Sequence, residues 1–136
     1  MDLLYVDSCV LIYALEEDPC FGIAARRGLA DAVARNQALA ISPLVQLECL
    51  VGPLARQQSE LLLRYQNWLR HFHWLGINDT TFSMATELRA RHGLKTPDAL
   101  HLATALQHGC RALISNDKRF ERAEADLESI ALRTTA

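Results

Sequence analysis

The sequence LLYVDSCVLIY, residues 3–13, joins a short apolar strand to an apolar helix that follows almost directly. Its first part, Leu3–Val6, is apolar at every position, which is typical of a strand covered on both faces in a parallel sheet packed between helices. A helix is predicted over Cys9–Leu15. Asp7 and Ser8 stand between the two elements. The stretch therefore predicts a strand of a parallel sheet with polar side chains at its carboxyl end.

The same alternation of short strands and longer helices continues along the chain. Ser42-Pro43 begins one helix, which Gly52-Pro53 is expected to end, and Thr96-Pro97 is a second signal of cap plus proline. The sequence therefore predicts one α/β domain over residues 1–136, with a parallel sheet of four to five strands and helices on both faces. Further strands are predicted at Leu39–Ile41, His73–Ile77, Ala112–Ser115 and Ser129–Leu132, and further helices at Phe21–Arg35, Pro43–Val51, Ser59–Phe72, Asp79–His92 and Pro97–His108.

Composition restricts the class of protein. Of the 136 residues, 50% are apolar and 22% are charged, with a net charge of −2, as in a folded domain. No apolar stretch approaches the ~18 residues of a membrane helix, and the first residues carry no basic leader, so we expect a cytoplasmic protein. The four cysteines lack the Cys-x-x-Cys spacing of zinc sites and are expected to be buried. An enzyme or a binding domain remains.

Four acidic residues lie where an open α/β sheet binds its ligands, beyond the carboxyl ends of strands or on the helices behind them. Asp7 and Asp117 follow strands, and each is also explained as a helix cap. On helical wheels, Asp98 falls among the apolar positions of the helix Pro97–His108, and Glu48 falls among those of the helix Pro43–Val51. Both carboxylates are therefore expected to point inward. The apolar arc that surrounds Glu48 consists of Leu44, Val45, Leu47 and Val51.

Inward carboxylates need a positive partner. Two carboxylates ~4 Å apart repel each other by about 4 kcal/mol at an effective dielectric constant of 20. A divalent cation relieves this repulsion, and all-oxygen ligation favours Mg²⁺ or Mn²⁺ over zinc or copper. Such a site binds the oxygens of a phosphodiester and activates water, so the four acids indicate hydrolysis of a polyanionic substrate.

Four segments of the chain resemble PIN-domain ribonucleases, and the layout is similar to that of VapC-type toxins of type II toxin–antitoxin systems. The third segment, TPDALHLATA, is the most specific of them. One departure is Cys9, where many members have asparagine or another polar residue, and this affects hydrogen bonding around the acids rather than the acids themselves. The segments are Tyr5–Tyr13, Ser42–Glu48, Thr96–Ala105 and Leu113–Asp117.

The resemblance implies that the first and fourth strands lie side by side, which brings Asp7 next to Asp117. It implies hydrolysis of RNA that depends on Mg²⁺ or Mn²⁺, a homodimer, and an antitoxin protein that blocks the site. The four acids Asp7, Glu48, Asp98 and Asp117 would share the metal ligation directly or through water. Ser8 and Asn116 would be supporting polar groups.

Several other residues have a functional and a structural interpretation. Lys118, Arg119 and Arg122 follow the fourth acid and either contact the RNA backbone or form a solvated turn. His101, one turn after Asp98, either orients a carboxylate or a substrate phosphate or is a structural histidine at the edge of the buried face. The structural interpretation is favoured, and His101 is not included in the catalytic set. The aromatic residues Tyr65, Trp68, Phe72 and Trp74 are expected in the core or in an oligomer interface rather than stacked on bases.

Alternative functions remain open. A catalytically silent PIN-like module that binds RNA or a protein is the main one, although the presence of all four acids argues against it. A phosphatase with an aspartyl nucleophile would need a second aspartate at the position of Cys9. A dinucleotide-binding enzyme would need a glycine-rich turn at Asp7–Cys9, and this chain has none there.

Overall fold

The computed structural model describes residues 2–117, 120 and 128–131. Within this part of the chain, five parallel strands form one sheet in the order β3-β2-β1-β4-β5. The predicted parallel sheet is therefore confirmed, and the first and fourth strands are neighbours as expected. The strands are β1 (Asp2–Val6), β2 (Gln37–Ile41), β3 (His73–Trp74), β4 (Ala112–Ser115) and β5 (Glu128–Ala131).

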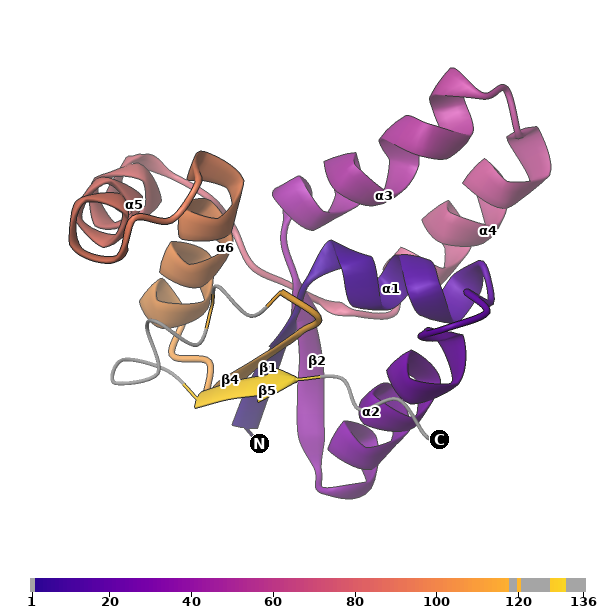
Figure 1. Cartoon of the computed structure of the whole chain (residues 1–136), viewed down its shortest axis with the longest axis horizontal. Helices are drawn as coiled ribbons and strands as arrows, with labels where there is room; N and C mark the ends of the chain where they lie inside the picture. The colour runs from indigo at the N-terminus through magenta and orange to yellow at the C-terminus, as the bar shows by residue number, and fades with distance from the viewer. Residues whose placement is uncertain (1, 118–119, 121–127, 132–136) are drawn as a thin grey trace.

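Helices cover both faces of the sheet. In Figure 1, α5 and α6 lie on one side of the strands and α1 and α2 lie on the other, while α3 and α4 run side by side and extend outward beyond α1. This arrangement is the α/β/α architecture expected from the sequence. In the described part of the chain, no helix has the length and apolar character needed to span a membrane. The helices are α1 (Ser8–Leu15), α2 (Gly22–Ala34), α3 (Pro43–Ala55), α4 (Ser59–Leu69), α5 (Asp79–His92) and α6 (Thr96–Gln107).

Strand β1 occupies the centre of the sheet and carries the register that positions the site. Tyr5 lies opposite Ala40 of β2 and Leu113 of β4, and Val6 lies opposite Ile114. The central strands are buried because helices pack on both faces, which explains why their sequences are apolar without alternation. The carboxyl ends of β1, β2 and β4 consequently meet at one edge, where α1 and α3 begin.

Helix α3 is longer than predicted, because Gly52-Pro53 does not end it. Proline lacks the N–H that would bond to the carbonyl four residues earlier, so Pro53 removes one hydrogen bond near the end of the helix. The helical turn nevertheless continues, since the N–H of Arg56 donates to the carbonyl of Gly52 at 3.0 Å, and Pro53 is buried. The expectation of a helix end near Val51 is therefore wrong.

The buried face of α3 also differs from the predicted arc. Val45, Cys49 and Pro53 are buried at intervals of four residues, whereas Leu47 and Val51 are 60% and 56% exposed. A single-helix wheel shows which residues share a face, but the packing of α3 against α1 and α4 determines which face is covered.

Boundaries of three further elements, β3, α4 and α6, differ from the sequence prediction. Strand β3 contains only His73 and Trp74, because its partner β2 ends at Ile41 and the N–H of Leu75 makes the last bond to the Ile41 carbonyl, at 2.8 Å. Helix α4 accordingly ends at Leu69 and the chain turns toward β3 before Phe72. At α6, Lys95 rather than Thr96 occupies the N-cap position.

Helix α5 begins and ends as predicted. Asn78 caps it with its Oδ1, which accepts a hydrogen bond from the Thr81 N–H at 3.2 Å, and Gly93 ends it in the left-handed conformation with φ of 67°. The same Oδ1 accepts a bond from the side chain of Gln107 on α6 at 3.0 Å. Asn78 therefore holds both the start of α5 and the contact between α5 and α6.

We expect Asn78→Ala to lower the free energy of unfolding by about 1 kcal/mol, because the cap of α5 is lost. The midpoint of thermal unfolding should fall by about 3–5 °C, measured by circular dichroism. Ser83→Ala, on the exposed side of the same helix, is the control and should shift the midpoint much less. Equal midpoints for the two variants would contradict the role given to Asn78.

Candidate functional site

Asp7 lies at the end of β1 and caps α1. Its backbone N–H donates to the Ile114 carbonyl at 3.1 Å, which extends the pairing between β1 and β4. Its Oδ1 accepts a hydrogen bond from the Ser8 N–H at 2.8 Å, and its Oδ2 accepts one from the Ser115 hydroxyl at 2.7 Å. The carboxylate is thus held by the first residue of α1 and the last residue of β4, and Asp7 is only 8% exposed.

Glu48 reaches the same place from the second turn of α3. Its Oε1 accepts a hydrogen bond from the Ser8 hydroxyl at 3.0 Å and lies 2.6 Å from Nε2 of His101 on α6. The same Nε2 is 3.8 Å from Oδ1 of Asp7. Glu48 is half-buried, at the side of the apolar face of α3, so its inward orientation is partial. One strand end and two helices therefore bring two carboxylates and one imidazole together.

These three side chains form a candidate metal site. One potential ligand atom from each of Asp7, Glu48 and His101 lies within 4.8 Å of the others. His101 is not placed in this group by the sequence reasoning, yet the structure buries it to 1% exposure at the centre. A signal was present, because Ala99–Ala105 is a buried segment in which His101 and Thr104 are the polar members, and a buried polar side chain needs a partner.

A second layer of buried polar groups supports His101. The Tyr5 hydroxyl lies 2.7 Å from Nδ1 of His101 and 2.8 Å from the hydroxyl of Ser42, and both Tyr5 and Ser42 are fully buried. Ser42 is the N-cap of α3, where its oxygen accepts a hydrogen bond from the Val45 N–H at 3.5 Å. The sequence reasoning identifies Ser42 only as a cap and gives Tyr5 no role beyond the strand.

The other predicted site residues lie near this group without joining it. Asp98 is half-buried in the first turn of α6, one turn before His101, and Asp117 follows β4. The Asp117 N–H donates to the Ser115 hydroxyl at 2.9 Å, and that hydroxyl donates to Asp7, so Ser115 links the two acids. In the described part of the chain, the 4.8 Å group contains neither Asp98 nor Asp117.

The structure describes the two predicted supporting residues, Ser8 and Asn116, but not the predicted RNA contacts. Ser8 supports both Asp7 and Glu48, as stated above, and Asn116 is half-buried between β4 and Asp117. The predicted RNA contacts Lys118, Arg119 and Arg122 lie outside the described residues.

The environment shifts the ionisation of several groups. Partial burial by itself raises the pKa of Glu48, but the hydrogen bond and attraction of His101 and the hydroxyl of Ser8 outweigh it, so the net pKa lies below its usual value. Burial raises the pKa of Tyr5 far above its usual range, so its hydroxyl stays protonated. Burial, with the charge of Asp7, raises the pKa of the Cys9 thiol to about 12.

The comparisons with known proteins agree with this geometry. Residues 4–126 match the family model of the PIN domain, so the chain belongs to the PIN domain family. The family membership expected from the four sequence segments is thereby confirmed. No curated protein matches the sequence.

Solved structures of toxin–antitoxin proteins have a similar fold. A chain of a toxin–antitoxin complex from Klebsiella pneumoniae is 26% identical, with 88% of this chain and 90% of that chain covered and a TM-score of 0.70. VapBC2 from Rickettsia felis, bound to a DNA fragment from its promoter, gives 18% identity, coverage of 96% and 99%, and a TM-score of 0.78. VapC20 from Mycobacterium tuberculosis, a toxin that cleaves the sarcin-ricin loop, is 16% identical, with 88% of this chain and 94% of that chain covered and a TM-score of 0.72.

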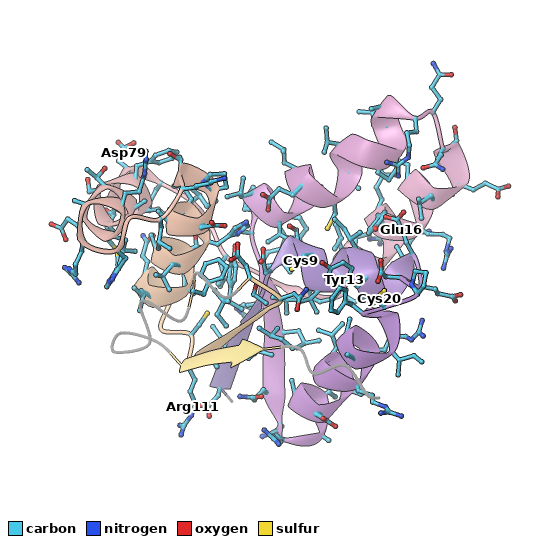
Figure 2. The ribbon with its side chains drawn as sticks, viewed as in Figure 1. Cys9, Tyr13, Glu16, Cys20, Asp79 and Arg111 are labelled. Carbon is cyan, nitrogen blue, oxygen red and sulfur yellow. The ribbon has the colours of Figure 1, made fainter. Side chains whose placement is uncertain are left out.

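The four cysteines are expected to differ in reactivity toward iodoacetamide at pH 8. The expectation that all four are buried is wrong for Cys20, which is exposed beyond the end of α1, whereas Cys49 and Cys110 are buried. Cys9 is half-buried, and Figure 2 shows it near the start of α1. Since the thiolate is the reactive form, a pKa of about 12 keeps Cys9 unreactive until strongly alkaline pH. Mass spectrometry should find Cys20 alkylated first. In the Cys20→Ser variant the fast phase should vanish, and fast alkylation of Cys9 would contradict the assignment of a protonated, packed thiol.

Proposed function

We propose that this protein is an endoribonuclease that depends on Mg²⁺ or Mn²⁺. The observation that carries the proposal is the convergence of Asp7, Glu48 and His101 at the carboxyl edge of the sheet of a PIN domain. Ligands of open α/β sheets bind at this edge. The similar fold of VapC20, a toxin that cleaves the sarcin-ricin loop, is consistent with RNA as the substrate.

The donor atoms fit a hard divalent cation. Carboxylate oxygens are the ligands that Mg²⁺ and Mn²⁺ prefer, and two of them, from Asp7 and Glu48, lie in one small region. Asp98 and Asp117, on the neighbouring helix turn and strand end, are proposed as the further acids that complete the ligation directly or through water. When bound, the ion would activate water for attack and stabilise negative charge on the phosphodiester oxygens.

The chain itself keeps these acids in place before any ion arrives. Asp7 accepts hydrogen bonds on both oxygens, and Oε1 of Glu48 lies within hydrogen-bond distance of two donors, so neither carboxylate has to be ordered on binding. Such preorganisation is a main source of electrostatic catalysis. The low exposure of Asp7 also limits competing water around its charge.

We further propose that the protein is the toxin of a toxin–antitoxin pair, with a cognate antitoxin as its protein partner. The 26% identical chain from a toxin–antitoxin complex, which this chain covers almost completely, supports this role. A homodimer in the cytoplasm, with Lys118, Arg119 and Arg122 at the RNA backbone, is part of the same proposal.

The purified protein should cleave RNA in Mg²⁺ or Mn²⁺, lose the activity in EDTA, and regain it when Mn²⁺ is added in excess. Asp7→Asn and Asp98→Asn should each lower the cleavage rate by roughly 10²- to 10³-fold, because each removes a charge that stabilises the reacting groups. Thermal unfolding shows that each variant is folded, which matters most for Asp7→Asn because an amide keeps only one of the two acceptor oxygens. Asp31→Asn, on the exposed face of α2, is the matched control and should keep the wild-type rate. RNA binding that resists EDTA, with no cleavage of several RNAs, would favour the catalytically silent module instead.

Expression of the wild-type protein in a bacterial host should arrest growth, and Asp98→Asn should not, because RNA cleavage is the proposed cause of toxicity. If a small protein is encoded immediately upstream and is the antitoxin, its co-expression should restore growth. Colony counts after induction measure both effects. Equal growth arrest by the wild type and Asp98→Asn would remove the nuclease activity from the explanation.

A further inference from the structure

A continuous chain of hydrogen bonds leads from Ser42, the residue before α3, through Tyr5 of the central strand and His101 of α6, to Glu48 on α3 itself. The hydroxyl of Ser42 lies 2.8 Å from that of Tyr5, which lies 2.7 Å from Nδ1 of His101. Nε2 of the same imidazole lies 2.6 Å from Oε1 of Glu48. Ser42, Tyr5 and His101 are at most 1% exposed, so water does not substitute for the two bonds that join these three residues.

The number of protons determines the direction of every bond in this chain. An ionised carboxylate only accepts, so the contact of 2.6 Å with Glu48 requires a proton on Nε2 of His101. In a neutral imidazole, Nδ1 then carries no proton, so it accepts a hydrogen bond from the Tyr5 hydroxyl. The Tyr5 oxygen is left to accept from the Ser42 hydroxyl, and the Ser42 oxygen accepts from the Val45 N–H.

A metal-ligating imidazole would need the opposite arrangement. The nitrogen that binds a metal must carry a lone pair, so Nε2 as a ligand would leave the proton on Nδ1, directed at the Tyr5 oxygen. With no proton on Nε2, the lone pairs of Nε2 and of the Glu48 carboxylate would face each other at 2.6 Å. The position of His101 beside two acids is that of a ligand, but its contact with Glu48 is that of a donor.

We propose that His101 is a positioning residue that donates from Nε2 to Glu48, with its tautomer fixed by Tyr5 and Ser42, and that it is not a metal ligand. This inference rests on the proposed function, because the purpose of the orientation is to present Glu48 to the cation. The donors from Ser8 and His101 both meet at Oε1, so the orientation of the whole carboxylate is fixed through that one oxygen.

The tautomer can be read directly by NMR of the protein labelled with ¹⁵N, at pH 8, first in EDTA and then with Mg²⁺ added. Long-range correlations between imidazole protons and nitrogens distinguish a proton on Nε2 from one on Nδ1. The His101 signals are assigned by their loss in His101→Gln. We expect the Nε2–H tautomer in both states. A proton on Nδ1 in the presence of Mg²⁺ would overturn the proposal.

Affinity for Mn²⁺, measured by calorimetry, tests the same chain without RNA. Tyr5→Phe removes one hydroxyl two bonds away from Glu48 and should weaken Mn²⁺ binding by about 10-fold, as outer partners of metal ligands do. Tyr65→Phe is the matched control, because Tyr65 is equally buried but its hydroxyl bonds to Glu16, at 2.5 Å. It should leave the affinity unchanged. Equal affinities for the two variants would contradict the proposal.

Substitutions of His101 itself test whether an N–H donor at this position supports Mn²⁺ binding. His101→Gln keeps such a donor and should retain more Mn²⁺ affinity than His101→Ala, and equal losses in the two variants would contradict donation to Glu48. Because the amide oxygen of glutamine can itself bind Mn²⁺, the tautomer of the wild type decides between donation and ligation. Thermal unfolding of each variant shows whether it is folded, and the NMR measurement on the wild type needs no variant. If the wild type binds no Mn²⁺, the proposed metal dependence fails while the tautomer still decides the hydrogen-bond chain. If Mn²⁺ binds as described but RNA is not cleaved, the proposed nuclease alone fails.

Discussion

The pairing of β1 with β2 on one side and with β4 on the other is the constraint on which the site depends. It sets Tyr5 opposite Ala40 and Leu113, so the residues that follow the three strands arrive together at one edge. Asp7 from β1 then meets Ser115 from β4, and Ser42 from the end of β2 meets the Tyr5 hydroxyl. Backbone pairing therefore brings the polar residues at the ends of β1, β2 and β4 to one edge, where α3 and α6 add Glu48 and His101.

Much of the fold could be predicted from the sequence, because the signals for its elements are local. Apolar runs mark the buried strands, and Asn78 and Gly93 mark both ends of α5 as the structure has them. The errors arise where a distant partner decides. Strand β3 stops because β2 stops, and α3 passes Pro53 although a proline usually ends a helix. Neither outcome can be inferred from the residues concerned.

The site was predictable to the extent that helix and strand geometry determine it. Asp7 at a strand end and Glu48 beside the apolar face of α3 are found together, and Asp7 is both a cap and a member of the group. Asp98 and Asp117 stay predictions as ligands. His101 could not be assigned to the site from sequence alone, because its partner Glu48 is 53 residues away. A single histidine in an apolar helix gives no indication of which residue accepts its hydrogen bond.

Helix α3 carries Ser42 at its start and Glu48 one and a half turns later, and both residues are tied to the chain of hydrogen bonds that passes through Tyr5 and His101. A loop of bonds is thereby closed between α3, β1 and α6. The first two turns of α3 are therefore attached at two points, through Ser42 to Tyr5 of β1 and through Glu48 to His101 of α6. The direction in which this helix leaves the sheet is consequently fixed by hydrogen bonds of its own side chains as well as by apolar packing.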